Sequence, residues 1–120
     1  MPHVHITLSP RITDVLDHSD LVTALNALVV DRSGSSGVSK TSMSPVETYG
    51  DGMVLHVEVA LLHGRSPAVK AHLSEGVLEL IATHLSKAGL EAVDLSVVVR
   101  DLPDSYRLSR GRSRAGAART

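Results

Sequence analysis

Apolar and polar residues alternate along three stretches of the chain, a pattern typical of β-strands with one buried face. These stretches are residues 3–8, 53–62 and 93–101. A fourth, weaker strand is predicted over 38–48. Pro45 interrupts this fourth stretch, and because proline has no N–H to donate to a ladder, we expect the strand at an edge of the sheet.

Two further stretches carry apolar residues three and four positions apart, the spacing of one side of an amphipathic helix. The first helix is expected to begin near Asp17 or Ser19, both good N-cap residues, and to end at Gly34. The second is expected to begin after Ser66, with a proline at its first position, and to end at Gly89. Their apolar positions are Leu21, Ala24, Leu25, Leu28 and Val29 in the first helix and Val69, Leu73, Val77, Leu80, Ile81 and His84 in the second.

The predicted elements follow the order strand, helix, strand twice. A segment predicted as a turn, Leu8-Ser9-Pro10-Arg11, recurs 54 positions later as Leu62-His63-Gly64-Arg65. Each half is therefore a βαβ unit, and two such units predict an α/β fold with a four-stranded mixed sheet and both helices on one face. A turn at Asp51-Gly52 is expected between the units. We expect one domain over residues 1–108 and a disordered basic tail over 109–120.

The sheet face away from the helices is predicted to be polar, mixed in charge and partly apolar. Because semi-apolar sheet faces are usually covered, we expect other subunits to pack against it. Its histidines allow a second interpretation, in which His3, His5, His56 and Glu58 converge as zinc ligands. Neutral, hydrogen-bonded histidines at an interface would account for the same pattern. The predicted face consists of His3, His5, Thr7, His56, Glu58, Ala60, Leu62, Asp94, Ser96, Val98 and Arg100.

Composition narrows the possible functions. The net charge is −1, so no overall field favours binding to nucleic acid or to a membrane. The chain has no cysteine, which excludes disulfides, thiol catalysis and cysteine-bound zinc. No apolar run approaches the roughly 20 residues that span a bilayer, and no signal peptide opens the chain, so we expect a cytoplasmic location. The only aromatic residues are Tyr49 and Tyr106, which leaves little scope for base stacking.

A proline stands directly before the first predicted strand. Initiator methionine is usually removed when the next residue is as small as proline, and its removal would leave Pro2 with a free secondary amine. The pKa of an α-amino group is ordinarily about 7.7–8.0, and burial or a nearby cation lowers it, so this amine could act as a general base. Alternatively, Pro2 only starts the strand, where its missing N–H does no harm.

Three short motifs carry a family resemblance. Met1-Pro2-His3 before a strand looks like the start of tautomerase superfamily chains. Gly64-Arg65-Ser66, between a strand and a helix, resembles a second signature of that superfamily. With Ser105-Tyr106-Arg107 near the end, the chain is most similar to the 5-carboxymethyl-2-hydroxymuconate isomerases, whose single chain holds two fused βαβ units. The resemblance covers about residues 2–108.

This resemblance implies an isomerase without cofactor or metal, assembled as a homotrimer. Its substrate would be a small unsaturated 2-oxo or 2-hydroxy carboxylate, within which Pro2 would move a proton. Arg65 matches the family arginine and would bind the carboxylate or stabilise the enolate, because a guanidinium suits a carboxylate geometrically. Arg11, in the corresponding place of the first unit, and Arg107 would assist in substrate binding. Each of these arginines could instead be an ordinary surface cation.

The chain departs from the isomerase branch in the loop entering the second strand. That branch carries an arginine where this chain has Ser39, followed by Lys40. Ser39 and Lys40 are therefore candidates for binding substrate. Lysine supplies positive charge but lacks the geometry by which arginine binds a carboxylate through two hydrogen bonds. The dicarboxylate substrate of that branch is therefore less strongly expected for this chain. Three other functions stay open. The first is an oligomeric interaction protein with this fold but no activity, and the second is a histidine-rich metal-binding protein. The third is a related isomerase or a hydrolytic dehalogenase-like enzyme that uses the same proline on another substrate.

Overall fold

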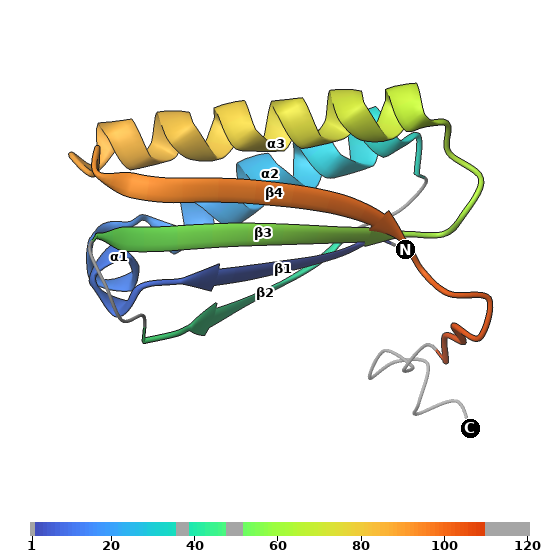
Figure 1. Ribbon diagram of the computed structural model, residues 1–120, viewed down its shortest axis with the longest axis horizontal. Coiled ribbons are helices and arrows are strands. Elements are labelled where there is room, and N and C mark those ends of the chain that lie inside the picture. The colour runs from blue at the N-terminus through green and yellow to red at the C-terminus, as the bar shows by residue number, and fades with distance from the viewer. Residues whose placement is uncertain (1, 36–38, 48–51, 110–120) are drawn as a thin grey trace, which may run out of the picture.

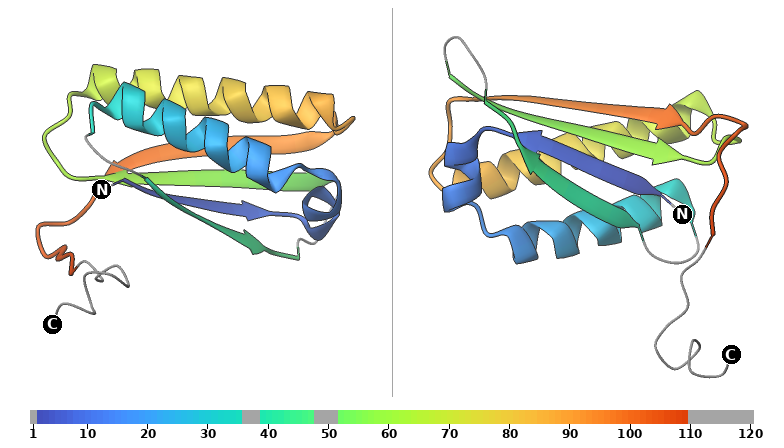
Figure 2. Two further views of the ribbon diagram at one scale, coloured as in Figure 1. Left: turned by 180° about the vertical axis from the view of Figure 1, so that it is seen from behind. Right: turned by 90° about the horizontal axis from the view of Figure 1, so that it is seen from below.

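The computed structural model describes residues 2–35, 39–47 and 52–109, which form one sheet layer and one helix layer (Figure 1). The strands are β1 (His3–Leu8), β2 (Lys40–Pro45), β3 (Met53–Leu61) and β4 (Val93–Asp101). The helices are α1 (Pro10–Val15), α2 (His18–Ser33) and α3 (Pro67–Lys87). The two long helices, α2 and α3, lie on the same face of the sheet, and none of the described helices covers the opposite face (Figure 2).

The strand order β2-β1-β3-β4 confirms the predicted pair of βαβ units. β1 is parallel to β2, β3 is parallel to β4, and the two units meet through the antiparallel pair β1 and β3. β2 is an edge strand, as Pro45 predicted. The antiparallel register pairs His3 with Ala60, so Pro2, one residue earlier, lies at the level of Leu61, where β3 ends.

The core lies between the sheet and the two long helices and is aliphatic. Alternate residues of β1 and β3 point into it, and the periodic residues of α2 and α3 meet them from above, as the sequence pattern predicted. Fully burying one such side chain contributes roughly 1.5–3 kcal/mol. The most deeply buried residues of these elements are Val4, Ile6, Leu8, Leu21, Leu25, Val29, Leu55, Val57, Val59, Leu61, Leu73, Val77 and Ile81.

The predicted helix ends are confirmed. Asp17 and Ser66 are the N-caps of α2 and α3, and each side chain accepts a hydrogen bond from the backbone N–H three residues later. Gly34 ends α2 in the left-handed conformation, with φ of 67°, which favours glycine because it has no Cβ. Gly89, one residue beyond the C-cap of α3, is also left-handed.

The prediction of a turn over Leu8-Ser9-Pro10-Arg11 is wrong, because the chain enters the helix α1 at Pro10. Proline at the first helical position suits a helix start, and α1 buries Ile12. Six residues are too few to display a helical period in the sequence. Ser9 is buried and extends the β1–β3 pairing, since its hydroxyl accepts a hydrogen bond from the Val54 N–H at 2.9 Å.

Some predicted features lie outside the described residues. They include positions 38 and 48 of the strand predicted over 38–48, Asp51 of the turn predicted at 51–52, and positions 110–120 of the predicted tail. Tyr49 is also outside the described residues. None of the helices described is both long enough and apolar enough to cross a membrane.

Candidate functional site

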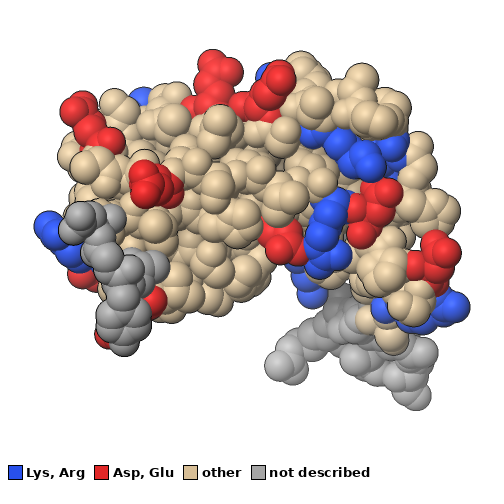
Figure 3. Space-filling view, in the orientation of Figure 1, with Lys and Arg blue, Asp and Glu red and all other residues tan. Residues whose placement is uncertain are grey.

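Most of the candidate residues lie at one end of the sheet, where β1 and β2 begin and β3 and β4 end. We call this the Pro2 end and define it by Pro2, Lys40, Arg65, Asp101 and Tyr106. This arrangement follows from the topology. Because β1 is antiparallel to β3, and each is parallel to its other neighbour, β1 and β2 begin at the end of the sheet where β3 and β4 finish. Most of the Lys and Arg side chains visible in Figure 3 lie around this end of the molecule.

Pro2 is buried at the start of β1. Its carbonyl accepts a hydrogen bond from the Lys40 N–H at 2.9 Å, which continues the pairing of β1 with β2 by one residue. The proline is therefore held by the sheet, and the lysine backbone lies beside it.

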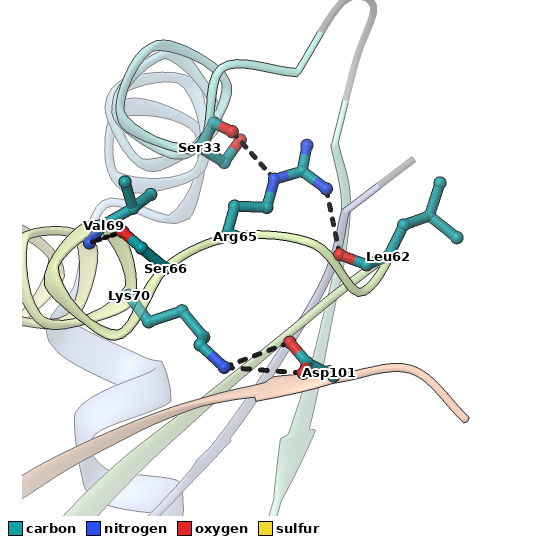
Figure 4. A network of polar contacts seen from close by, with 7 residues as sticks. All are labelled: Ser33, Leu62, Arg65, Ser66, Val69, Lys70 and Asp101. Carbon is teal, nitrogen blue, oxygen red and sulfur yellow. Dashed lines mark hydrogen bonds and ion pairs between the residues drawn. The ribbon is translucent and has the colours of Figure 1, made fainter. Parts of the chain in front are cut away.

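Arg65 reaches from the loop between β3 and α3 to the C-terminal end of α2 (Figure 4). Its Nε donates to the Ser33 carbonyl at 3.0 Å, and its Nη1 donates to the Leu62 carbonyl at 3.0 Å. Its Nη2 donates to the Ser35 hydroxyl at 3.1 Å. All three guanidinium nitrogens are thus engaged, and the side chain joins the end of α2 to the end of β3.

The environment of Arg65 differs from the simple interpretation of a cation beside the N-terminus of α3. Its guanidinium lies at the C-terminus of α2, where a positive charge is favourable because the last carbonyls point outward. The three acceptors are uncharged, and within residues 2–35, 39–47 and 52–109 no carboxylate forms an ion pair with Arg65. The guanidinium is held rigidly while its charge is not neutralised.

Two neighbouring cations differ from Arg65 because each is paired with a carboxylate. Lys70 of α3 points toward Asp101 at the end of β4, with 3.3 Å between Nζ and Oδ1 (Figure 4). Arg100 donates from Nε to Glu58 on the adjacent strand. In the part of the chain that the structure describes, Lys40 and Arg107 form no ion pair. Among the described residues, Lys40, Arg65 and Arg107 are therefore candidates whose charge no carboxylate neutralises.

Ser39 is buried and turned toward the helices. Its hydroxyl donates to Asn26 Oδ1 on α2 at 2.6 Å, and Thr41 on β2 donates to the same oxygen. The Ser39 side chain therefore secures the start of β2 from inside, whereas Lys40 beside it is exposed. Sequence reasoning missed Asn26, although a half-buried amide on an otherwise apolar side of a helix was a possible signal.

Arg11 lies apart from the other candidates. It is exposed on α1, which follows the C-terminal end of β1, whereas Pro2 precedes the start of that strand. A strand rises about 3.3 Å per residue, so the length of β1 separates the two residues by roughly 20 Å within one chain. Arg11 can meet a Pro2 amine only if the two come from different copies of the chain.

Comparison with solved structures identifies the fold. A 5-carboxymethyl-2-hydroxymuconate delta-isomerase superimposes with a TM-score of 0.77 and 18% identity over 92% of this chain and 89% of that chain. A 5-carboxymethyl-2-hydroxymuconate isomerase from Deinococcus radiodurans R1 gives a TM-score of 0.75 and 14% identity, covering 92% and 90%. A fused 4-OT symmetric trimer gives 0.63 and 24% over 97% of each chain.

The chain has the tautomerase fold. The expectation drawn from the three sequence motifs is confirmed at the level of fold, in agreement with the β2-β1-β3-β4 order and the helices on one face. No family model matches the sequence, and no curated protein matches it. A macrophage migration inhibitory factor-like protein from Entamoeba histolytica shares the fold at a TM-score of 0.66 and 15% identity, covering 90% of this chain and 95% of that one.

On the open face of this tautomerase fold, polar side chains pair with neighbours across the strands. His5 Nδ1 is hydrogen-bonded to Ser42 Oγ and His56 Nδ1 to Ser96 Oγ, each at 2.6 Å. Glu58 accepts from Arg100. Three of the four potential zinc ligands, His5, His56 and Glu58, thus have a partner on an adjacent strand, and the described residues hold no group of three or more side chains that could bind a metal.

A further pair at the Pro2 end was not predicted. His3 Nε2 and the Tyr106 hydroxyl are hydrogen-bonded at 2.9 Å, although the two residues are 103 positions apart. Histidine is next to Pro2 in the sequence, and Tyr106 is one of only two aromatic residues in the chain. The scarcity of aromatic residues was the available signal, but no local pattern indicates which residue Tyr106 contacts.

Proposed function

We propose that this protein is a cofactor-independent isomerase that moves a proton within a small unsaturated 2-oxo or 2-hydroxy carboxylate. The general base is the secondary amine of Pro2, which becomes free when Met1 is removed. One observation carries the proposal: Pro2 is buried at the Pro2 end of the sheet, and the cations Lys40, Arg65 and Arg107 form no ion pair within the described residues. The structural likeness to two hydroxymuconate isomerases supports it.

The proposed reaction needs only a base and fixed positive charge. The Pro2 nitrogen removes a proton either from an acidic carbon of a 2-oxo substrate or from the hydroxyl of a 2-hydroxy substrate, and in both cases the bonding electron pair stays on the substrate as a dienolate. The protonated amine then returns the proton to a different carbon, so that atoms and electrons balance without an oxidant or metal. Such general acid–base catalysis contributes about 10²–10⁴-fold, and an oriented guanidinium stabilises the developing negative charge.

In this proposal each cation has its own role in binding the substrate or stabilising the enolate. Arg65, already held by α2, stabilises the enolate or binds the carboxylate. Lys40 and Arg107 bind the substrate carboxylate, and Ser39 secures Lys40 through its bond to α2. Arg11 belongs to the site of a neighbouring subunit, because it lies at the other end of β1. The protein then acts as a homotrimer joined through the open sheet face, in keeping with the symmetric trimer formed by the fused 4-OT protein.

The first experiment establishes whether Pro2 has a free nitrogen and whether that nitrogen matters. Intact mass shows whether Met1 is absent from the purified protein. Enol–keto conversion of phenylenolpyruvate and 2-hydroxymuconate is then measured for wild type, Pro2→Ala and a chain with extra residues before Pro2. We expect the extended chain to lose about 10²-fold or more in kcat/KM, because its nitrogen becomes a peptide amide.

A matched control is Pro10→Ala, which alters an exposed proline at the first position of α1 and is expected to keep full activity. Pro2→Ala should lose less than the extended chain, because a primary amine remains. Equal rates in wild type, Pro2→Ala and the extended chain would reject Pro2 as the base. Retained Met1 would have the same consequence, since the nitrogen would then be an amide.

One alternative is a protein with the same fold but without catalytic activity. The likeness to a macrophage migration inhibitory factor-like protein shows that the fold is not confined to proteins named as isomerases. In this alternative the chain forms an oligomer that binds other molecules without turnover. A trimer in sedimentation analysis with no conversion of either enol substrate would favour it over the isomerase.

A further inference from the structure

The segment that follows β4 folds back against the Pro2 end. The Leu102 N–H donates to the Leu61 carbonyl, and the Tyr106 N–H donates to the Pro103 carbonyl at 2.9 Å, which closes a turn. Figure 2 shows this segment passing close to the start of β1. Leu102 and Tyr106 are half-buried, whereas 103–105 and 107–109 are exposed. Tyr106 therefore anchors this segment beyond its first position, and an exposed contact between His63 and Asp104, with 3.8 Å between Nε2 and Oδ1, also joins the segment to the loop after β3.

Tyr106 contacts β1 at His3. The Tyr106 hydroxyl is hydrogen-bonded to His3 Nε2 at 2.9 Å, and the two rings meet edge to face with centroids 5.6 Å apart. Ala60 pairs with His3 in the sheet and is only 4% exposed, although it lies on the open face. A buried alanine on an open face indicates that the returning segment covers the sheet at this position.

Two neighbours of this pair belong to the proposed site. His3 directly follows Pro2, and Arg107 directly follows Tyr106. Arg107 Nη1 donates to the carbonyls of Asp104 and Tyr106, so its guanidinium is held against its own turn. The hydrogen bond between His3 and Tyr106 therefore connects the residue after Pro2, the proposed base, with the residue before Arg107, a proposed carboxylate-binding cation.

We propose that His3 and Tyr106 form a positioning pair that holds Arg107 at the Pro2 end for binding of the substrate carboxylate. The inference rests on the proposed function, since it assigns the pair a part in that same site. Tyr106 acts through Arg107 and does not itself handle the proton. The pair therefore controls how tightly a carboxylate binds, while the chemical step stays with Pro2.

The test uses the full-length protein and the enol substrates named above. Tyr106→Phe removes only the hydroxyl, and a hydrogen bond of this kind is worth about three- to tenfold in an equilibrium. We expect KM to rise by about that factor while kcat changes less than twofold. In an Arg107→Ala background, Tyr106→Phe should raise KM no further, because the cation it positions is gone. His3→Gln, which retains a side-chain nitrogen able to bond Tyr106, should restore part of the loss seen with His3→Leu.

Ser42→Ala is the matched control. It breaks the His5–Ser42 hydrogen bond, which is also a histidine–hydroxyl pair on the open face but lies one step farther along β1. KM should be unchanged in this variant. If Tyr106→Phe left KM unchanged, the inference would be overturned even though the enzyme is active. The same holds if Tyr106→Phe raised KM equally in wild type and in the Arg107→Ala background.

Hydrogen exchange separates this outcome from failure of the proposed function. The amides of residues 102–109 should exchange at least threefold faster in Tyr106→Phe than in wild type, and Ser42→Ala should leave them unchanged. If wild type converts no substrate, the proposed function falls and the substrate role of the pair falls with it. If exchange over 102–109 is the same in Tyr106→Phe and wild type, the pair does not hold the segment, whatever the activity.

Discussion

Replacing Arg65 should destabilise the protein, whether or not the residue also binds substrate. Arg65→Ala removes three hydrogen bonds from a half-buried charged donor to Ser33, Ser35 and Leu62. At about 0.5–1 kcal/mol each, given partial exposure, they contribute about 2 kcal/mol. The favourable charge at the C-terminus of α2 adds about 0.3–1 kcal/mol. We therefore expect the free energy of unfolding to fall by about 2–3 kcal/mol.

The assay is urea denaturation, supported by thermal unfolding. For a domain of this size, 1 kcal/mol corresponds to about 4 °C in Tm, so Arg65→Ala should unfold about 8–12 °C lower. The slope of the free energy against urea should not change if the folded state stays compact. Arg65→Lys keeps the charge but not the three-way geometry and should lose about half as much. Arg11→Ala, at an exposed position of α1, is the control and should change stability by less than about 0.5 kcal/mol.

If Arg65→Ala lowered the free energy of unfolding by less than about 0.5 kcal/mol, this reasoning would be refuted, because the hydrogen bonds of Arg65 to α2 and to the end of β3 would then contribute nothing measurable. The lysine variant also separates stability from function. At a temperature where Arg65→Lys is fully folded, a large fall in kcat/KM would have to come from the site. Unchanged kcat/KM in that folded variant would leave Arg65 only its structural role.

Two further substitutions test contacts behind the site. Gly76→Ala should be nearly neutral, because the gain in helix propensity of about 1 kcal/mol is offset by displacing the Arg32 guanidinium, which the new Cβ would overlap. In an Arg32→Ala background the same change should stabilise by about 1 kcal/mol in urea denaturation, and an equal effect in both backgrounds would contradict this account. Asn26→Ala should cost about 1–3 kcal/mol, because it leaves the buried Ser39 hydroxyl without its acceptor. Adding Ser39→Ala should recover part of that loss, and strictly additive losses would show that the pair is not coupled.

Local patterns predicted most of the fold. The strands and long helices were predicted because alternation and capping depend on residues a few positions apart, as at Asp17, Ser66 and Gly34. The edge position of β2 followed from the chemistry of Pro45 alone. The helix α1 was missed because its start signals, Ser9 and proline, are equally typical of a turn.

The candidate site was predicted only as a set of residue types. Pro2 and Arg65 were recognisable from short motifs, but their surroundings were not. The sequence placed Arg65 next to the start of α3, whereas its side chain caps α2, which the fold brings to it from 32 residues away. Ser39 was considered for substrate binding, and the structure shows its hydroxyl facing Asn26 inside the protein.

By itself, the sequence determined where the strands and helices lie, which of their faces are apolar and which residue begins the chain's first strand. These properties follow from interactions within one or two turns of chain, so they can be read locally. Only the tertiary structure shows that Lys40, Arg65 and Tyr106 share one end of the sheet with Pro2, while Arg11 lies at the other. This arrangement depends on the pairing of strands that are far apart in sequence, and the free energy that selects the pairing comes from burying the aliphatic core as a whole.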